Sequence, residues 1–131
     1  MTPIEAIANI EALQTIIDVV ASPIFVKDRE HRWVLLNDSM CKFMGLPREK
    51  LIGKSDFDVV PPEQAQIFWT LDDRVFLSCE ENENEEEHTD LDGNVRTIVT
   101  RKRLVHVGKE RIPLLVAVIT DITAFREAEA H

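Results

Sequence analysis

The strongest hydrophobic pattern in the chain is a continuous apolar run near its C-terminal end. Residues 112–119 read I-P-L-L-V-A-V-I, so seven of the eight are aliphatic and Pro113 is the exception. A run of this length that is rich in Val and Ile predicts a strand covered on both faces. Asp121 and Thr123 then favour helix N-caps, and a short charged helix should follow over residues 124–131. The pattern predicts a buried strand that leads directly into an exposed terminal helix.

The apolar residues among the first twenty positions have a different spacing. Apolar side chains follow alternating steps of three and four from Pro3 through Ala6 to Val20, with charged and polar residues between them. This spacing predicts an amphipathic helix with a narrow seam of the coiled-coil type. The helix can lie on its own domain, or it can meet its copy in a dimer through Ile10, Leu13, Ile17 and Val20.

Two short strands and a short helix are expected next. Residues 24–27 and 32–36 are apolar runs on either side of a polar turn, which predicts a hairpin. Asn37 supplies a cap for a helix over residues 40–44, and Gly45 ends that helix. One further helical turn should follow it.

The longest internal helix is expected from Pro61 or Pro62 to about Cys79. Its apolar side chains fall on one face that is wide enough to cover a sheet. These residues are Ile67, Phe68, Leu71, Val75, Phe76 and Cys79. Such a face is first of all expected to be part of the hydrophobic core, and it can also form the wall of a ligand pocket.

The C-terminal half predicts three more strands. Six of the eight residues from Glu80 to Glu87 are Glu, which is typical of a solvated edge strand or loop whose charge deters aggregation. An acidic docking patch has the same signature. Asp92-Gly93 and residues 107–109 predict hairpins before and after a long strand. Strands at both ends of the chain with helices between them indicate an α+β domain with an antiparallel sheet.

Composition restricts the partners of such a domain. The chain has 131 residues, of which 44% are hydrophobic and 30% charged, and its net charge is −9. These values indicate one globular domain and argue against nucleic acid and anionic membranes as partners. No apolar run approaches the length of about 18 residues needed for membrane insertion, and the N-terminus lacks the basic region of a secretory signal. With Cys41 and Cys79 expected as free thiols, we expect a cytoplasmic protein.

The order of these features resembles the PAS family of sensory domains over roughly residues 10–126. The resemblance rests on Asn37 at the end of the second strand and on the segment F-M-G-L-P-R-E-K-L-I-G-K-S that begins at Phe43. The Asp-Gly hairpin and the D-I-T sequence at residues 121–123 add to it. The family fold implies a five-stranded antiparallel sheet with helices that enclose a pocket on one face.

The resemblance also implies a domain organisation and a role. We expect an N-terminal amphipathic dimerisation helix over residues 1–20 on the other face of the sheet, a PAS core over 21–123 and the start of a signalling helix over 124–131. Such domains are non-catalytic sensory modules of bacterial signalling proteins such as sensor histidine kinases. A homodimer and a downstream effector domain are therefore the expected partners. The stop at His131 inside a helix favours a piece of a longer sensor.

The resemblance allows known cofactors to be tested residue by residue. The flavin-binding subgroup has a photoreactive cysteine where this chain has Asp56, which cannot form the adduct. Its flavin-binding amides would fall at His88 and Ile98, and a glutamine would fall at Ile119. None of these positions carries an amide, so flavin photochemistry is excluded.

Two further cofactors are tested in the same way. The haem-binding subgroup takes its axial histidine from the long helix, which has none between Pro61 and Cys79, so haem is disfavoured. The coumaric-acid photoreceptors use Tyr and Cys at the chromophore, and this chain has no Tyr. No cofactor or metal is therefore predicted, and an unidentified small molecule remains the expected ligand.

A pocket can be placed from the alternation of residues along the strands. Inward residues of three strands, counted from the Asp-Gly hairpin, form one side of it, and apolar residues of helices and connectors form the rest. Such a mainly apolar cavity with a few polar groups is typical of ligand pockets. The expected lining is Phe43, Ile52, Phe57, Ile67, Phe68, Leu71, Glu86, His88, Ile98, Thr100, Ala117 and Ile119. Val116 and Val118 are left on the outer face, which needs a cover.

Among the inward residues, His88 has the side chain that can take the widest range of roles. A buried imidazole must be hydrogen-bonded, and both burial and Glu86 should move its pKa. Three interpretations stay open: a core histidine bonded to protein or water, a ligand contact or pH sensor, and a metal or catalytic role.

Three functions from different classes follow. The first is a sensory and dimerisation module, in which a ligand biases the packing of the last strand and the change passes through Asp121 and Thr123 into the terminal helix. The second is a PAS-like scaffold with a filled core that only mediates protein contacts. The third is a small α+β enzyme with His88 and Glu86 as an acid–base pair, although no nucleophile or oxyanion donor set accompanies them.

Overall fold

The computed structural model describes residues 2–130 of the chain, without the side chains of Ala6 and Ile7. Met1 and His131, the outer ends of the two predicted terminal segments, lie outside the described residues, and so does the Ala6 side chain of the predicted seam. Both cysteines, Cys41 and Cys79, are free thiols. No helix in the described range is both long and apolar enough to cross a bilayer.

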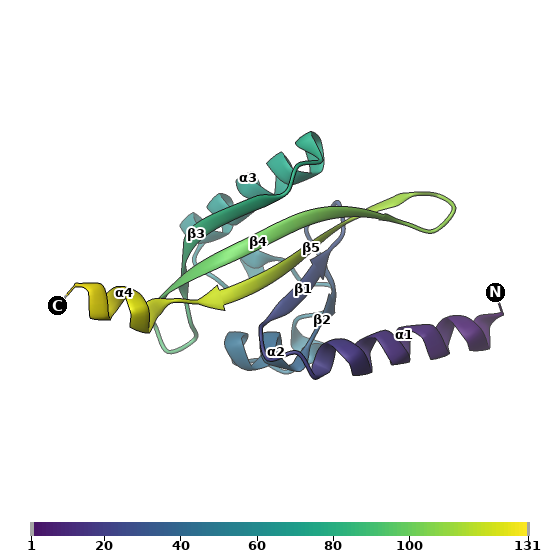
Figure 1. Ribbon diagram of the computed structural model, residues 1–131, viewed down its shortest axis with the longest axis horizontal. Helices are drawn as coiled ribbons and strands as arrows, with labels where there is room; N and C mark the ends of the chain where they lie inside the picture. The colour runs from purple at the N-terminus through teal and green to yellow at the C-terminus, as the bar shows by residue number, and fades with distance from the viewer. Residues whose placement is uncertain (1, 131) are drawn as a thin grey trace.

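The fold is built on a five-stranded antiparallel sheet. Its strands are β1 (Ile24–Lys27), β2 (Trp33–Leu36), β3 (Asn82–Thr89), β4 (Val95–Val107) and β5 (Ile112–Asp121). Their spatial order is β2-β1-β5-β4-β3, so the apolar C-terminal strand lies in the centre and the Glu-rich strand β3 forms one edge (Figure 1). This arrangement confirms the predicted α+β class and both predicted C-terminal hairpins.

Two helices and two turns lie against one face of this sheet. They are α2 (Asp38–Met44), α3 (Pro62–Ser78) and the 3-10 turns Arg48–Lys50 and Asp56–Asp58. The main core lies between this layer and the sheet, and it contains Phe25, Trp33, Leu36, Met40, Met44, Leu51, Val75, Phe76, Ile98, Leu115, Ala117 and Ile119. The inward positions of β4 and β5 therefore supply the sheet side of the core, as strand alternation predicts.

Asn37 organises the junction between the N-terminal segment and the core. Its Oδ1 accepts the backbone N–H of Met40 at 3.0 Å, which caps α2, and that of Ile24 at 2.9 Å. Its Nδ2 donates to the carbonyls of Ile17 and Ser22, both at 3.0 Å. A single buried side chain thus fixes where the first strand begins and where the N-terminal helix ends.

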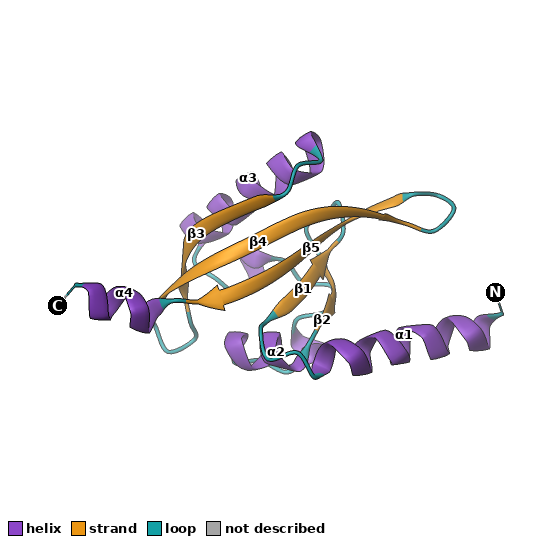
Figure 2. Cartoon of the chain, in the orientation of Figure 1, coloured by secondary structure: helices purple, strands orange, loops and turns teal. Residues whose placement is uncertain are grey.

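The terminal helices project from opposite ends of the molecule (Figure 2). Helix α1 (Pro3–Asp18) begins with a capping box in which Thr2 and Glu5 bond to each other's backbone N–H groups. Helix α4 (Thr123–Glu129) follows β5 after a single residue. Beyond Thr123, the described residues of α4 are exposed.

The outer face of β5 is not covered within the single chain, which corrects the prediction of a strand buried on both faces. Leu115, Ala117 and Ile119 on the inner face are at most 3% exposed, whereas Val118 on the outer face is 37% exposed. The expected cover, α1, instead contacts mainly α2 and β2. The bonds of Asn37 hold the end of α1 beside the edge of the sheet, so the helix leaves from that edge and does not cross the face.

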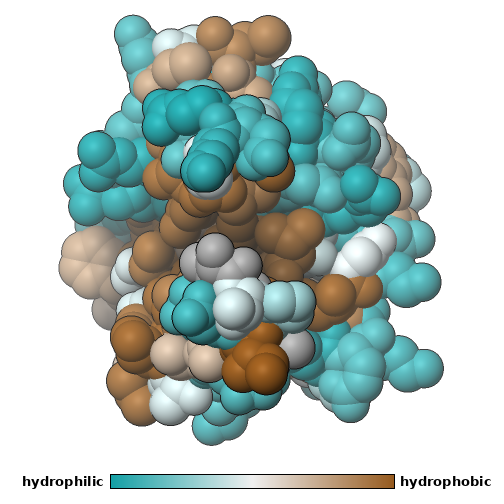
Figure 3. Space-filling view, turned by 90° about the vertical axis from the view of Figure 1, so that its right-hand side faces the viewer, coloured by the Kyte–Doolittle hydropathy of each residue, from teal (hydrophilic) through white to brown (hydrophobic). Residues whose placement is uncertain are grey.

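The apolar residues of α1 therefore remain at the surface. Of the four residues predicted for a dimer contact, Ile17 is half-buried and Ile10, Leu13 and Val20 are 63%, 48% and 40% exposed. Figure 3 looks onto the side of the molecule toward which the start of α1 points, and it shows hydrophobic surface gathered in the middle of a hydrophilic border.

Candidate functional site

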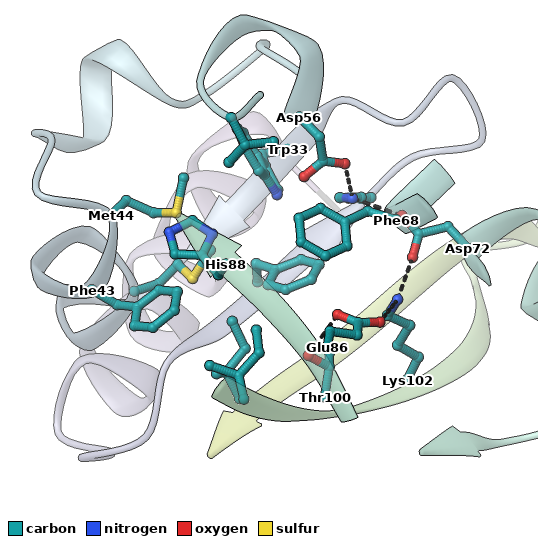
Figure 4. Close-up of a pocket in the computed structure, with 16 residues that line it drawn as sticks. Trp33, Phe43, Met44, Asp56, Phe68, Asp72, Glu86, His88, Thr100 and Lys102 are labelled. Carbon is teal, nitrogen blue, oxygen red and sulfur yellow. Dashed lines mark hydrogen bonds and ion pairs between the residues drawn. The ribbon is translucent and has the colours of Figure 1, made fainter. Parts of the chain in front are cut away.

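A small cavity lies between the inner face of the sheet and helices α2 and α3 (Figure 4). Its volume is about 30 Å³. This is enough for a water molecule and too small for a drug-sized ligand, which occupies a pocket of about 300 Å³ or more. The lining residues are Phe25, Lys27, Trp33, Met40, Phe43, Met44, Asp56, Val60, Phe68, Asp72, Glu86, His88, Ile98, Thr100, Lys102 and Ile119.

One wall of the cavity, which we call the charged wall, is a row of five buried charges: Asp56, Lys27, Asp72, Lys102 and Glu86. Successive side chains have opposite sign, and the N–O distances along the row are 2.5, 2.6, 3.1 and 2.8 Å. The row connects β1, β3, β4, α3 and the turn at Asp56. Buried charges are tolerated when each has a close partner of opposite sign, and this row meets that condition.

Asp72, fully buried on α3, is the centre of the charged wall. Burial opposes its ionisation, but Lys27, His31 and Lys102 outweigh burial and hold its pKa well below the usual range. Burial also opposes the charged form of Lys27, and the carboxylates of Asp56 and Asp72 outweigh it and raise its pKa. At Asp56 burial dominates and raises the pKa. The Asp72 carboxylate in the middle of the row is therefore more strongly kept in its ionised form than the Asp56 carboxylate at one end.

The opposite wall, the apolar wall, consists of Met40, Phe43 and Met44 of α2 together with His88 of β3. The His88 ring lies 4.7 Å from that of Phe43, centroid to centroid. Burial lowers the pKa of His88, against a weaker opposing effect of Asp90 and Asp121, so the ring stays neutral. Glu86, which we expected to influence this pKa, instead binds Lys102 and Thr100.

Two buried nitrogen atoms on the cavity lining have no hydrogen-bond partner among the described residues. They are Nε2 of His88 and Nε1 of Trp33, whose side chains are 4% and 2% exposed. Figure 4 shows Trp33 between the two walls, and the Lys27 ammonium of the charged wall lies 5.7 Å from the centroid of its ring. Since buried polar atoms are rarely left unpaired, these two nitrogens are exceptional positions on the lining.

His31, in the turn between β1 and β2, lies behind the charged wall. Its ring stacks on Trp69 at 4.1 Å between centroids, and its Nε2 lies 2.8 Å from Oδ1 of Asp73. Its Nδ1 lies 3.7 Å from Oδ2 of Asp72. Burial opposes protonation here, but the two carboxylates outweigh it, so the pKa of His31 is raised. This histidine extends the charged wall to the surface of α3.

Comparison with known proteins decides the family. A family model described as the PAS fold matches residues 17–127. The chain belongs to the PAS-fold family. An uncharacterized protein, y4lL, of Sinorhizobium fredii (strain NBRC 101917 / NGR234) is 35% identical over 119 residues, which cover 89% of this chain. The chain spans only 14% of the length of that relative.

Solved structures agree on the fold of this PAS domain. The PAS domain of Bordetella pertussis BvgS has a TM-score of 0.73 and 23% identity, and the match covers 94% of this chain and 96% of that one. A PAS domain from a two-component sensor histidine kinase has a TM-score of 0.69 and 10% identity, with coverage of 88% and 98%. PAS domains are typical of sensory signalling proteins, including histidine kinases, and are generally non-catalytic.

Seven of the twelve residues that the sequence suggested for the pocket of the PAS domain lie on the cavity: Phe43, Phe68, Glu86, His88, Ile98, Thr100 and Ile119. Ala117 is fully buried in the core but is not part of the lining. Four others lie elsewhere. Ile52, Phe57 and Ile67 are 40%, 43% and 54% exposed, and Leu71 is half-buried beside β3.

The orientation of α3 explains two of these misplacements. The helix turns Ala65, Phe68, Asp72 and Val75 toward the sheet, because Asp72 is held by lysines of β1 and β4. Ile67 and Leu71 are thereby rotated outward. The predicted face is thus correct for Phe68, Val75 and Phe76, which are buried, and a face chosen by apolar residues alone cannot include Asp72. Cys79, the last residue predicted for that face, is exposed.

Of the charged wall, only Glu86 was placed on the cavity by the sequence, and the row of alternating charges was not predicted. A signal for two of its members was present, because Lys27 and Lys102 follow the inward residues Phe25 and Thr100 by two positions in their strands. Asp72 follows Phe68 by four positions, which places both on one face of the helix. Extending the alternation to polar residues would have found these three.

The joint between β5 and α4 is a compact set of polar contacts. Oδ1 of Asp121 accepts the Thr123 backbone N–H at 3.0 Å and its hydroxyl at 2.6 Å. Oγ1 of Thr123 accepts the Thr97 backbone N–H at 2.8 Å, and Arg96 binds the other oxygen of Asp121 at 2.9 Å. Burial opposes ionisation of Asp121, but Thr123 and Arg96 outweigh it and lower its pKa. The two residues thus connect the start of α4 to both β4 and β5.

The geometry gives little support to a catalytic use of His88 and Glu86. Both side chains face the cavity, but the two oxygens of Glu86 are taken by Lys102 at 2.8 Å and Thr100 at 3.1 Å. General acid–base catalysis needs a carboxylate that is free to exchange a proton with a substrate. Among the described residues, no three His, Cys, Asp or Glu side chains are grouped so that they could hold a metal ion.

Proposed function

We propose that this PAS domain is a non-catalytic sensory module of a longer bacterial signalling protein, of the kind found in sensor histidine kinases. A small molecule that enters the cavity is the signal, and the joint at Asp121 and Thr123 passes the response to α4. Membership of the PAS family and the likeness to a histidine-kinase PAS domain support the general role. The observation that carries the sensing step is the pair of unpartnered nitrogens of Trp33 and His88.

An unpaired buried nitrogen has a cost that a ligand can remove. Leaving a buried donor or acceptor unsatisfied costs about 1–3 kcal/mol, so a molecule that bonds to both nitrogens gains affinity from each. The cavity must widen to admit anything larger than water. Met40 and Met44 in the apolar wall make this possible, because unbranched Met side chains adapt to irregular spaces.

The route from the cavity to α4 is short. Ile119 of β5 lines the cavity, and Asp121 lies two residues farther along the same strand. A ligand that displaces Ile119 changes the end of β5 and with it the contacts of Thr123. Such a ligand shifts α4 only by its difference in affinity for the two arrangements, and coupling of this kind amounts to about 1–3 kcal/mol.

The sensing step can be tested by native mass spectrometry together with amide hydrogen exchange. We expect the purified protein to retain a small molecule that His88→Phe loses, and we expect its release to speed exchange at the amides of α4. Ile67→Ala is the matched control, because Ile67 lies outside the cavity and should leave both readouts unchanged. Exchange in α4 that is the same with and without the bound molecule contradicts the proposal.

We also propose that the module acts as a homodimer through α1 and the outer face of the sheet. The exposed Ile10 and Leu13 on α1 and the exposed Val118 on β5 support this, since all three need a cover that the single chain lacks. Deletion of residues 1–20 should convert a dimer to a monomer in sedimentation velocity. A dimer that survives the deletion removes α1 from the interface.

A second candidate is a scaffold that mediates protein contacts without a ligand. The cavity volume of about 30 Å³ favours it, because side chains already fill most of the space. The scaffold predicts that no small molecule is retained and that His88→Phe leaves the exchange of α4 unchanged. The same measurements therefore separate the two functions.

A further inference from the structure

We infer that the ligand of this cavity is an uncharged molecule that offers a hydrogen-bond acceptor to Trp33 and an apolar body to the wall around His88. The inference rests on the proposed sensing function and adds the chemical class of the signal. It follows from which groups on the cavity lining are already paired and which are free.

The charged wall has no place for an anion. An anionic ligand needs a cation whose charge is not already offset, and within the part of the chain that the structure describes the cationic side chains on the lining are Lys27 and Lys102. Each ammonium already contacts two carboxylates within 3.1 Å. The wall also has one carboxylate more than it has ammonium groups, so a further negative charge would be repelled.

A cation is disfavoured for a different reason. Both oxygens of Glu86 are bonded, and Asp72 lies between two lysines, so a cationic ligand would have to compete with an internal lysine. At Asp56, one end of the row, burial raises the pKa and so reduces the attraction for a cation. A buried charge without a dedicated partner is strongly unfavourable.

Among the described residues, the lining groups that have neither a hydrogen-bond partner nor an ion pair are neutral, since Oδ1 of Asp72, which accepts no hydrogen bond, lies 3.1 Å from the Lys102 ammonium. The Trp33 indole N–H can only donate, so the ligand must present an acceptor such as a carbonyl, ether or aromatic nitrogen. His88 is kept neutral by burial, so its Nε2 can donate or accept according to tautomer. Phe43 and Met44 beside His88 then contact apolar or aromatic parts of the same molecule.

The inference can be tested with compounds of one shape and three charges. Benzamide, benzoate and benzamidine are nearly isosteric, and acetamide, acetate and acetamidine repeat the series at a size closer to that of the closed cavity. The full chain, first freed of any retained molecule, is titrated with each compound. The readout is the indole N–H resonance of Trp33, which a Trp33→Phe variant assigns and separates from that of Trp69.

We expect the neutral amides to shift the Trp33 resonance and to bind at least about tenfold more tightly than either charged analogue. Tighter binding of benzoate or benzamidine overturns the inferred class and leaves the sensing function in place. If none of the compounds shifts the Trp33 resonance, the inferred ligand class is wrong, and the sensing function is then decided separately by the retained molecule and the exchange of α4. A neutral compound that binds equally to the wild type and to Trp33→Phe removes the acceptor requirement.

Discussion

The two walls of the cavity each have a buried histidine beside them, and the two histidines differ in almost everything except burial. His31 is 5% exposed and His88 is 4% exposed. His31 lies against Asp72 and Asp73, which raise its pKa, whereas burial among Phe43 and its neighbours lowers that of His88. A small exposed fraction therefore does not by itself determine the pKa of a histidine. Burial lowers it at His88, whereas carboxylates beside the ring outweigh burial at His31.

The two walls also differ in the interactions that hold their side chains in place. The charged wall is fixed by four N–O contacts between 2.5 and 3.1 Å, two of which join Asp72 of α3 to lysines of the sheet. The apolar wall is held by dispersion and hydrophobic burial, which have no preferred direction. We infer that a ligand enters by rearranging the apolar wall while the charged wall holds α3 in place.

The largest effect is expected from breaking the charged wall at its centre. Asp72→Ala leaves Lys27 and Lys102 with one carboxylate each, and removing one member of a buried ion pair costs about 3–5 kcal/mol. Glu63→Ala is the control on the same helix, because the Glu63 side chain is exposed and its loss should cost less than about 1 kcal/mol. Urea denaturation measures both. Equal losses for the two variants would mean that the row of charges does not hold α3.

A smaller effect is expected in the apolar wall. Met44 is 5% exposed, so Met44→Ala should lower the free energy of unfolding by about 2–3 kcal/mol and enlarge the cavity. Binding of benzamide should become tighter, because less rearrangement is then needed. Ile67→Ala serves as the control, since its 54% exposed side chain should cost well under about 1 kcal/mol. Weaker binding of benzamide to Met44→Ala would locate the ligand elsewhere.

The two histidines should give opposite pH dependences. The pKa of His31 is raised, so its contribution to stability is complete below the unfolded value of about 6.5 and is lost as pH rises through the folded pKa. The pKa of His88 is lowered, so its contribution is complete above about 6.5 and is lost as pH falls. The measurement is the unfolding free energy of the wild type minus that of His31→Gln or His88→Gln across this range. Two differences with the same slope would refute the contrast.

Much of the fold could be predicted from the sequence because its signals are local. The Asp92-Gly93 hairpin sets the register of β3 and β4, and alternation from it places Glu86, Ile98 and Thr100 inward. The path of α1 could not be predicted, because it depends on bonds from Asn37 to carbonyls 15 and 20 residues away in the chain. Local periodicity contains no information about such contacts.

The site was predictable where strand alternation or hydrophobic periodicity determines which residues face inward. Phe43, Phe68 and Ile119 follow from hydrophobic periodicity, and all three lie on the cavity. Asp72 does not follow from it, because an ionised residue on an inward helix face is stable only with partners from other elements. The volume of the cavity is also beyond the sequence, since it depends on how side chains such as Met44 fill the space.

The smallest effect on stability is expected outside both walls, at the joint between β5 and α4. Thr123→Ala removes the acceptor of the Thr97 N–H and one of the two donors to Oδ1 of Asp121, a loss of about 1–2 kcal/mol. Thr123→Ser keeps the hydroxyl and should be close to wild type. Exchange of the α4 amides should become faster in the alanine variant and lose its response to cavity occupation, while the exchange of β3 and α2 stays unchanged. If α4 still responds in Thr123→Ala, the signal leaves β5 by another route, and the two walls communicate with the helix independently of this contact.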